Sequence, residues 1–142
     1  MVDIPEHLIR YPTKRAIDAL ASRFDLRNEP HMQDWQWEVA DPERLDEFLA
    51  VYNLPELTDD ERFVLMEIII ESFEETSAIL EHDPGWHAVL DWLDHNIAIH
   101  AHTVWYWSCD DEVLENCWRV TPYLRLVRDR HRHLAKQSSS ST

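Results

Sequence analysis

The sequence predicts an all-α protein, a single-domain bundle of about five to seven helices. Two observations support this fold class. Helix-start signals recur along the whole chain, and the 142 residues include a single glycine, Gly85. Sheet proteins need glycine in tight turns and bulges, so its scarcity argues against a sandwich or barrel. Stacking of the same helices as hairpins, as in an α-solenoid, is the alternative arrangement.

The first half of the chain contains three predicted helices. Each begins after a capping side chain and continues with apolar residues at helical spacing: 14–25 after Thr13, 42–53 after Asp41, and 59–81 after Thr58. A capping side chain accepts hydrogen bonds from the first free N–H groups of a helix. The third helix begins with a capping box, residues 58–61, and is apolar around most of its circumference. It is therefore expected at the centre of the core.

The second half predicts further helices. Asp83-Pro84 opens a long helix to about Trp107, another helix starts at Ser108 or Asp110, and a last one runs from Thr121 to about Leu134. Proline fits the first turn of a helix because the N–H groups of that turn have no hydrogen-bond partner within the helix. The absence of an N–H on proline therefore removes no helical hydrogen bond.

Two segments depart from this helical pattern. Residues 35–39 alternate apolar and polar side chains, which predicts a short β ribbon or an extended linker. The domain is expected over residues 1–135. The Ser-rich residues 136–142 are expected to form a disordered tail.

The chain is strongly acidic, with a formal net charge of −15. Residues 1–118 hold 27 Asp and Glu against seven Lys and Arg, whereas residues 119–142 have a net charge of +5. An acidic body repels the phosphate backbone, so nucleic acid is not an expected partner. It favours association with a basic protein surface.

Several functional classes lack their sequence signatures. One glycine cannot build a phosphate-binding loop, which excludes the usual nucleotide-binding motifs. The Glu-x-x-His signature of di-iron bundles is absent. We find no apolar run long enough to cross a membrane and no secretion signal. On one helix Cys109 and Cys117 would lie about 12 Å apart, too far for a disulfide, so we expect reduced thiols and a cytoplasmic protein.

Two groups of residues are candidate contacts with a protein partner. Glu67, Glu71 and Glu74 share a narrow stripe of the 59–81 helix with Asp60 and Glu81. Between the helices, Trp35 and Trp37 alternate with polar and acidic residues that include Asp34 and Glu38. The alternatives are a solvated acidic edge and Trp side chains that anchor a long connection to the core.

A histidine stripe is the weak candidate for a metal site. His87, Asp91, His95 and His102 fall on one face of the helix expected over residues 84–107. Imidazole and carboxylate groups one turn apart can chelate a divalent ion. However, this face avoids the apolar side of the helix, so we expect hydrated side chains, no bound metal and no cofactor.

These features favour a binding protein over an enzyme. A small, acidic, helical protein rich in aromatic residues resembles, in general character, the bacterial immunity proteins that cover basic toxin domains. The resemblance is one of composition and assigns no residue. We therefore expect an inhibitor that occludes a basic toxin or enzyme. One alternative is a helical adaptor or scaffold, and another is a metal-dependent helical-bundle enzyme that uses His87, Asp91 and His95.

Overall fold

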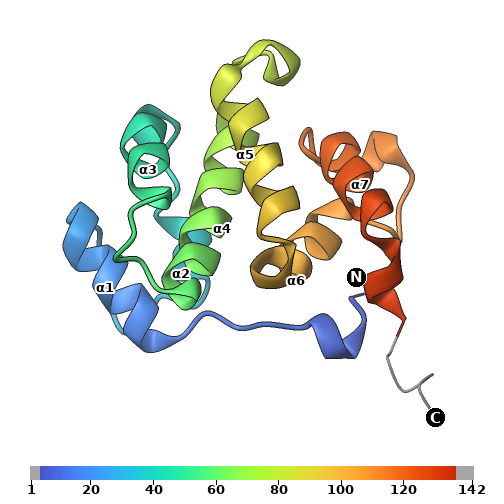
Figure 1. Ribbon diagram of the computed structural model, residues 1–142. Coiled ribbons are helices and arrows are strands. Elements are labelled where there is room, and N and C mark those ends of the chain that lie inside the picture. Colours follow the sequence, from blue (N-terminus) through green and yellow to red (C-terminus); the bar gives the residue numbers. More distant parts are fainter. Residues whose placement is uncertain (1–3, 137–142) are drawn as a thin grey trace. The chain divides into compact units, whose positions relative to one another are not determined.

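The computed structural model describes residues 4–136, and the all-α prediction is confirmed. Within this range the chain forms seven α-helices and five short 3-10 helices and contains no strand (Figure 1). Residues 137–142, most of the predicted tail, lie outside the described residues.

The chain divides into two compact units. One unit is Tyr11–Gly85, and the other comprises Met1–Arg10 together with Trp86–Thr142. Each unit has buried apolar residues of its own. The expectation of one domain over residues 1–135 stays a prediction.

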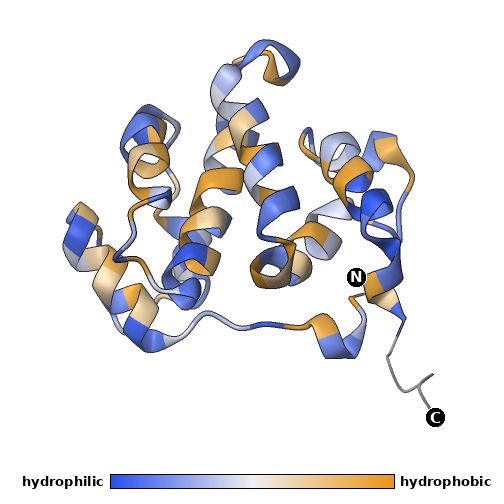
Figure 2. Cartoon of the chain, viewed as in Figure 1, coloured by the Kyte–Doolittle hydropathy of each residue, from blue (hydrophilic) through white to orange (hydrophobic). Residues whose placement is uncertain are grey.

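In the unit Tyr11–Gly85, α4 (Asp59–Glu75) is the central helix. It packs against α1 (Lys14–Phe24), α2 (Trp35–Glu38) and α3 (Leu45–Tyr52) (Figure 1). Most of its apolar side chains are fully buried: Phe63, Val64, Leu65, Met66, Ile68, Ile69, Ile70 and Phe73. Figure 2 shows this stretch of α4 in the hydrophobic colour. Burial of each such side chain contributes roughly 1.5–3 kcal/mol, so α4 dominates this core as the sequence predicts.

The predicted caps of this unit are confirmed, but Asp41 caps the 3-10 helix Pro42–Arg44, and α3 begins only at Leu45. The Thr13 hydroxyl accepts a hydrogen bond from the Ala16 N–H (3.1 Å), and the Asp41 carboxylate accepts one from the Glu43 N–H (3.0 Å). Both bonds of the capping box between Thr58 and Glu61 are present. Caps are read correctly from sequence because they depend on residues only two or three positions apart.

The end predicted for the third helix is wrong. α4 ends at Glu75, and only a 3-10 helix, Leu80–His82, forms beyond it. Thr76 is extended (ψ 161°), and its hydroxyl donates to the Phe73 carbonyl and accepts from the Ala78 N–H. The Thr76 hydroxyl thus competes with the helical hydrogen bonds of the main chain, and the helix ends there.

Residues 35–39 form neither a β ribbon nor an extended linker. Residues Trp35–Glu38 are the short helix α2, and the Asp34 N–H donates to the Glu38 side chain (3.1 Å). The Trp35 indole N–H donates to the Arg27 carbonyl. Tertiary anchoring of Trp35 thus overrides the alternating pattern.

The second unit contains α5 (Pro84–His95) from Trp86 onward, α6 (Ile97–Ser108) and α7 (Thr121–Arg130), followed by a 3-10 helix, Arg132–Ala135. The single helix predicted over residues 84–107 is wrong, because the chain breaks at Asn96 (φ −113°, ψ 35°). Asparagine tolerates such breaks since its side chain competes for backbone hydrogen bonds. α7 packs along α6.

Candidate functional site

The chain between α6 and α7 is closed by a disulfide between Cys109 and Cys117, whose Cα atoms are 6.2 Å apart. The predictions of a helix from Ser108 or Asp110 and of reduced thiols are therefore wrong. α6 ends at Ser108, and Cys109 takes the left-handed conformation (φ 54°), which turns the chain out of the helix. Only the 3-10 helix Leu114–Asn116 follows, so the chain can return to bring Cys117 within bonding range.

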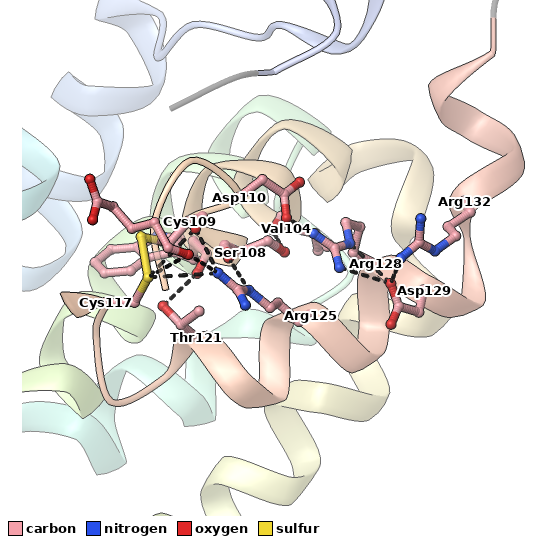
Figure 3. Close-up of polar contacts among 12 residues, drawn as sticks. Val104, Ser108, Cys109, Asp110, Cys117, Thr121, Arg125, Arg128, Asp129 and Arg132 are labelled. Carbon is pink, nitrogen blue, oxygen red and sulfur yellow. Dashed lines mark hydrogen bonds and ion pairs between the residues drawn. A yellow bond between two sulfur atoms is a disulfide. The ribbon is translucent and has the colours of Figure 1, made fainter. Parts of the chain in front are cut away.

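Arg125 of α7 holds this turn from the other side (Figure 3). Its guanidinium donates to the carbonyls of Ser108 (2.6 Å), Cys109 (2.7 Å) and Glu112 (2.9 Å). The last carbonyls of a helix have no partner within the helix, and a cation there also complements the helix dipole. Arg125 thus caps α6 and fixes the first part of the loop, residues 109–117.

Directly after the loop, Trp118 packs into an aromatic cluster with residues of α6. The Trp118 ring stacks on Tyr106 (5.4 Å between centroids) and contacts Trp107 edge-on (4.6 Å). The Thr121 hydroxyl accepts from the Trp118 N–H (3.2 Å) and donates to the Trp107 carbonyl (2.9 Å). Both ends of the loop are therefore anchored in packed structure. Two cysteines eight residues apart, flanking an acidic segment, are the sequence signal that would have identified this loop.

The acidic stripe predicted on the 59–81 helix is only partly at the surface. Glu67 is buried, with 2% of its surface exposed, and the Gln36 amide donates to its carboxylate (3.5 Å). Glu71 and Glu74 are half-buried, and Glu75, absent from the predicted set, is exposed. Glu81 lies outside α4. The surface part, Glu71, Glu74 and Glu75, is hereafter the α4 acidic edge.

The three carboxylates of the α4 acidic edge crowd one another. Burial raises the pKa of Glu71 to about 8, with further contributions from a hydrogen bond with Glu75 and from the charges of Glu75 and Glu74. Glu71 therefore keeps a proton at neutral pH. A cation placed beside it would favour loss of that proton.

The raised pKa of Glu71 predicts stability that falls with pH. Between about pH 4.5 and 8 the folded protein keeps a proton that the unfolded chain releases, so the free energy of unfolding decreases as pH rises through this window. After allowance for solvent screening of this half-buried group, we expect a decrease of about 1–2 kcal/mol. Glu71→Gln is expected to remove it, as measured by urea unfolding at pH 5 and pH 8.5.

Asp46→Asn, an exposed change in α3, is the matched control and is expected to keep the wild-type pH slope. An unchanged slope in Glu71→Gln would contradict the assignment of the proton to Glu71.

The other candidate contact residues lie on or beside α2. Trp35 is buried (3% exposed) and Trp37 is half-buried, whereas Asp34 and Glu38 are exposed. Trp35 therefore belongs to the core, as in the alternative of a Trp side chain that anchors the connection. α2 packs on α4; Glu38 is the last residue of α2, and Asp34 directly precedes its first residue.

The break at Asn96 divides the predicted histidine stripe between two helices. His87, Asp91 and His95 lie on α5, whereas His102 lies on α6 and accepts a hydrogen bond from the Arg10 N–H (3.1 Å). Burial lowers the pKa of His102. His95 contacts the Asp91 main-chain carbonyl (2.8 Å). Across residues 4–136 no three His, Cys, Asp or Glu side chains are grouped to hold a metal ion.

The basic residues near the end of the chain are engaged with nearby carboxylates. Arg128 pairs with Asp110 and Asp129, and Arg130 pairs with Asp94 (2.6 Å). These ion pairs offset part of the positive charge of residues 119–142.

The sequence matches no family model, and no curated protein and no solved structure shows significant similarity to it. Among the described residues, none of the helices has both the length and the apolar character that a membrane crossing requires.

Proposed function

We propose that this protein is an inhibitor of the immunity-protein type, which neutralises a basic toxin or enzyme by occluding it. The observation that carries the proposal is the distribution of charge between the two units. The unit Tyr11–Gly85 holds 19 Asp and Glu against six Lys and Arg, a net charge of −13 out of −15 for the chain. Charge of one sign on one compact unit speeds encounter with a basic partner.

The α4 acidic edge is the proposed centre of contact. Burial, followed by the neighbouring carboxylates of Glu75 and Glu74, raises the pKa of Glu71, and a basic partner would favour its ionised form. Asp34 and Glu38 on the adjacent α2 extend the surface, with Trp37 as its aromatic member. Glu67 and Trp35, which are buried, are not part of it.

Charge reversal at the α4 acidic edge is expected to slow binding. In a variant with Glu71→Lys and Glu74→Lys, we expect association with the partner to be at least tenfold slower at low salt, with a much smaller difference at high salt. Stopped-flow or surface-plasmon measurements at two ionic strengths give both rates. A control variant with Glu43→Lys and Asp46→Lys changes two exposed residues of the same unit and is expected to retain most of the rate. At neutral pH it alters the net charge by about one unit more than the edge variant, because Glu71 already carries a proton.

The partner for this measurement comes from the native host. The first candidate is the product of an adjacent gene, because immunity proteins are normally encoded beside their toxins. Stable co-purification of the two proteins and loss of the partner's activity in the complex are the expected results. If the edge variant and its control associate at the wild-type rate at low salt, the edge is only a solvated face.

The proposal does not depend on a cellular compartment. The cytoplasmic location expected from sequence assumed reduced thiols, and the disulfide between Cys109 and Cys117 removes that support.

A further inference from the structure

The loop of residues 109–117 presents two apolar side chains to solvent. Val113 is 58% exposed and Leu114 is 50% exposed. Of the large apolar side chains exposed within residues 4–136, these are the one pair that is adjacent in sequence. An exposed apolar surface with a polar rim is typical of contacts with a partner.

The same loop is held rigidly. The disulfide closes it, Arg125 binds the carbonyls of Cys109 and Glu112, and Arg128 binds the Asp110 carboxylate (Figure 3). Within the loop, the N–H of Asn116 donates to the Val113 carbonyl (2.9 Å). A loop fixed before binding loses little conformational entropy on association, which favours affinity.

The charge of the loop indicates what it would contact. Asp111, Glu112 and Glu115 belong to exposed residues on either side of the apolar pair, and the fourth carboxylate of the loop, Asp110, is paired with Arg128. Elsewhere the unit holds seven Lys and Arg against five Asp and Glu, so its negative charge is concentrated in this loop. A surface complementary to the loop combines an apolar recess with a basic rim.

We infer that the loop of residues 109–117 is an insertion element for a partner protein, with Val113 and Leu114 entering an apolar recess whose rim carries Lys and Arg. The inference rests on the proposed function for the basic character of the partner. It assigns the apolar contact, however, to a surface different from the α4 acidic edge.

The test uses the full-length oxidised protein as bait for a phage-displayed library of random twelve-residue peptides. We expect enriched peptides that combine large apolar residues with flanking Lys or Arg. Their synthetic forms are expected to bind at least tenfold more weakly to a variant with Val113→Ser and Leu114→Ser. Ile79→Ser, which removes an equally exposed apolar side chain from the other unit, is expected to leave the affinity within twofold.

Two further variants make the result specific. Removal of the disulfide by Cys109→Ser and Cys117→Ser is expected to weaken binding about tenfold, because the loop must then be ordered on association. The variant with Glu71→Lys and Glu74→Lys is expected to bind the peptides as the wild type does. Circular dichroism of each variant confirms the helical fold.

The inference is overturned if no peptide is enriched, if the peptides lack the basic and apolar pattern, or if the Val113 and Leu114 variant binds them normally. If the peptides lose affinity only for the variant with Glu71→Lys and Glu74→Lys, the inference is also overturned, and the α4 acidic edge is supported as their binding surface. Conversely, if the peptides need the loop but the natural partner associates normally with the α4 variant, the loop stands and the proposed role of the edge fails.

Discussion

Glu67→Lys is expected to lower the free energy of unfolding by about 3–5 kcal/mol. Glu67 is 2% exposed and accepts a hydrogen bond from the Gln36 amide where α2 packs on α4. A lysine there would place a cation in a buried position and replace the acceptor with a donor. Burial of an uncompensated charge is among the few changes that destabilise a protein this strongly. Urea unfolding at pH 7, followed by tryptophan fluorescence, measures the change.

Glu75→Lys is the matched control, two turns further along α4. Because Glu75 is exposed and crowds Glu71, the substitution is expected to leave stability within about 0.5 kcal/mol or to raise it slightly. Equal stability of Glu67→Lys and wild type would mean that Glu67 faces solvent, and the original stripe of Glu67, Glu71 and Glu74 would then be restored as a surface.

Glu67 and Glu71 show why helical spacing alone could not predict which glutamates of α4 lie at the surface. The 100° rule correctly placed Glu67 near Glu71 on one side of α4, but it does not show which neighbour covers that side. α2 covers Glu67, and the sequence predicted a β ribbon or linker for α2. The wrong prediction for residues 35–39 thus led to the wrong prediction that Glu67 lies at the surface.

Local signals predicted the fold better than signals that depend on distant residues. Thr13, Asp41 and the capping box at Thr58 were read correctly because each acts within one turn of helix. The disulfide joins residues eight positions apart, and no side-chain cap marks the break at Asn96. An unbroken apolar pattern predicted a continuous helix over residues 84–107, and the rise along the further helix expected from Ser108 or Asp110 placed Cys109 and Cys117 too far apart for a disulfide.

Arg125→Met is expected to lower the free energy of unfolding by about 3 kcal/mol. The guanidinium donates to three main-chain carbonyls, two of which belong to the buried residues Ser108 and Cys109 at the end of α6. Hydrogen bonds from a charged donor contribute about 1.5–3 kcal/mol each, and the partial exposure of Arg125 reduces their sum. Methionine keeps much of the aliphatic stem, so the loss reports the missing donors rather than missing packing.

Arg132→Met serves as the control for removal of a positive charge from the same basic segment. Arg132 pairs with Asp129 at the surface, with the two side chains 69% and 44% exposed, and such a pair contributes at most about 1 kcal/mol. Urea unfolding under non-reducing conditions compares the two variants with the disulfide intact. If Arg125→Met is no less stable than Arg132→Met, the disulfide and the aromatic cluster hold the loop without Arg125. In that case loop rigidity would come from the Cys109–Cys117 disulfide and Trp118, and Arg125→Met would leave peptide binding unchanged, unlike the double cysteine variant.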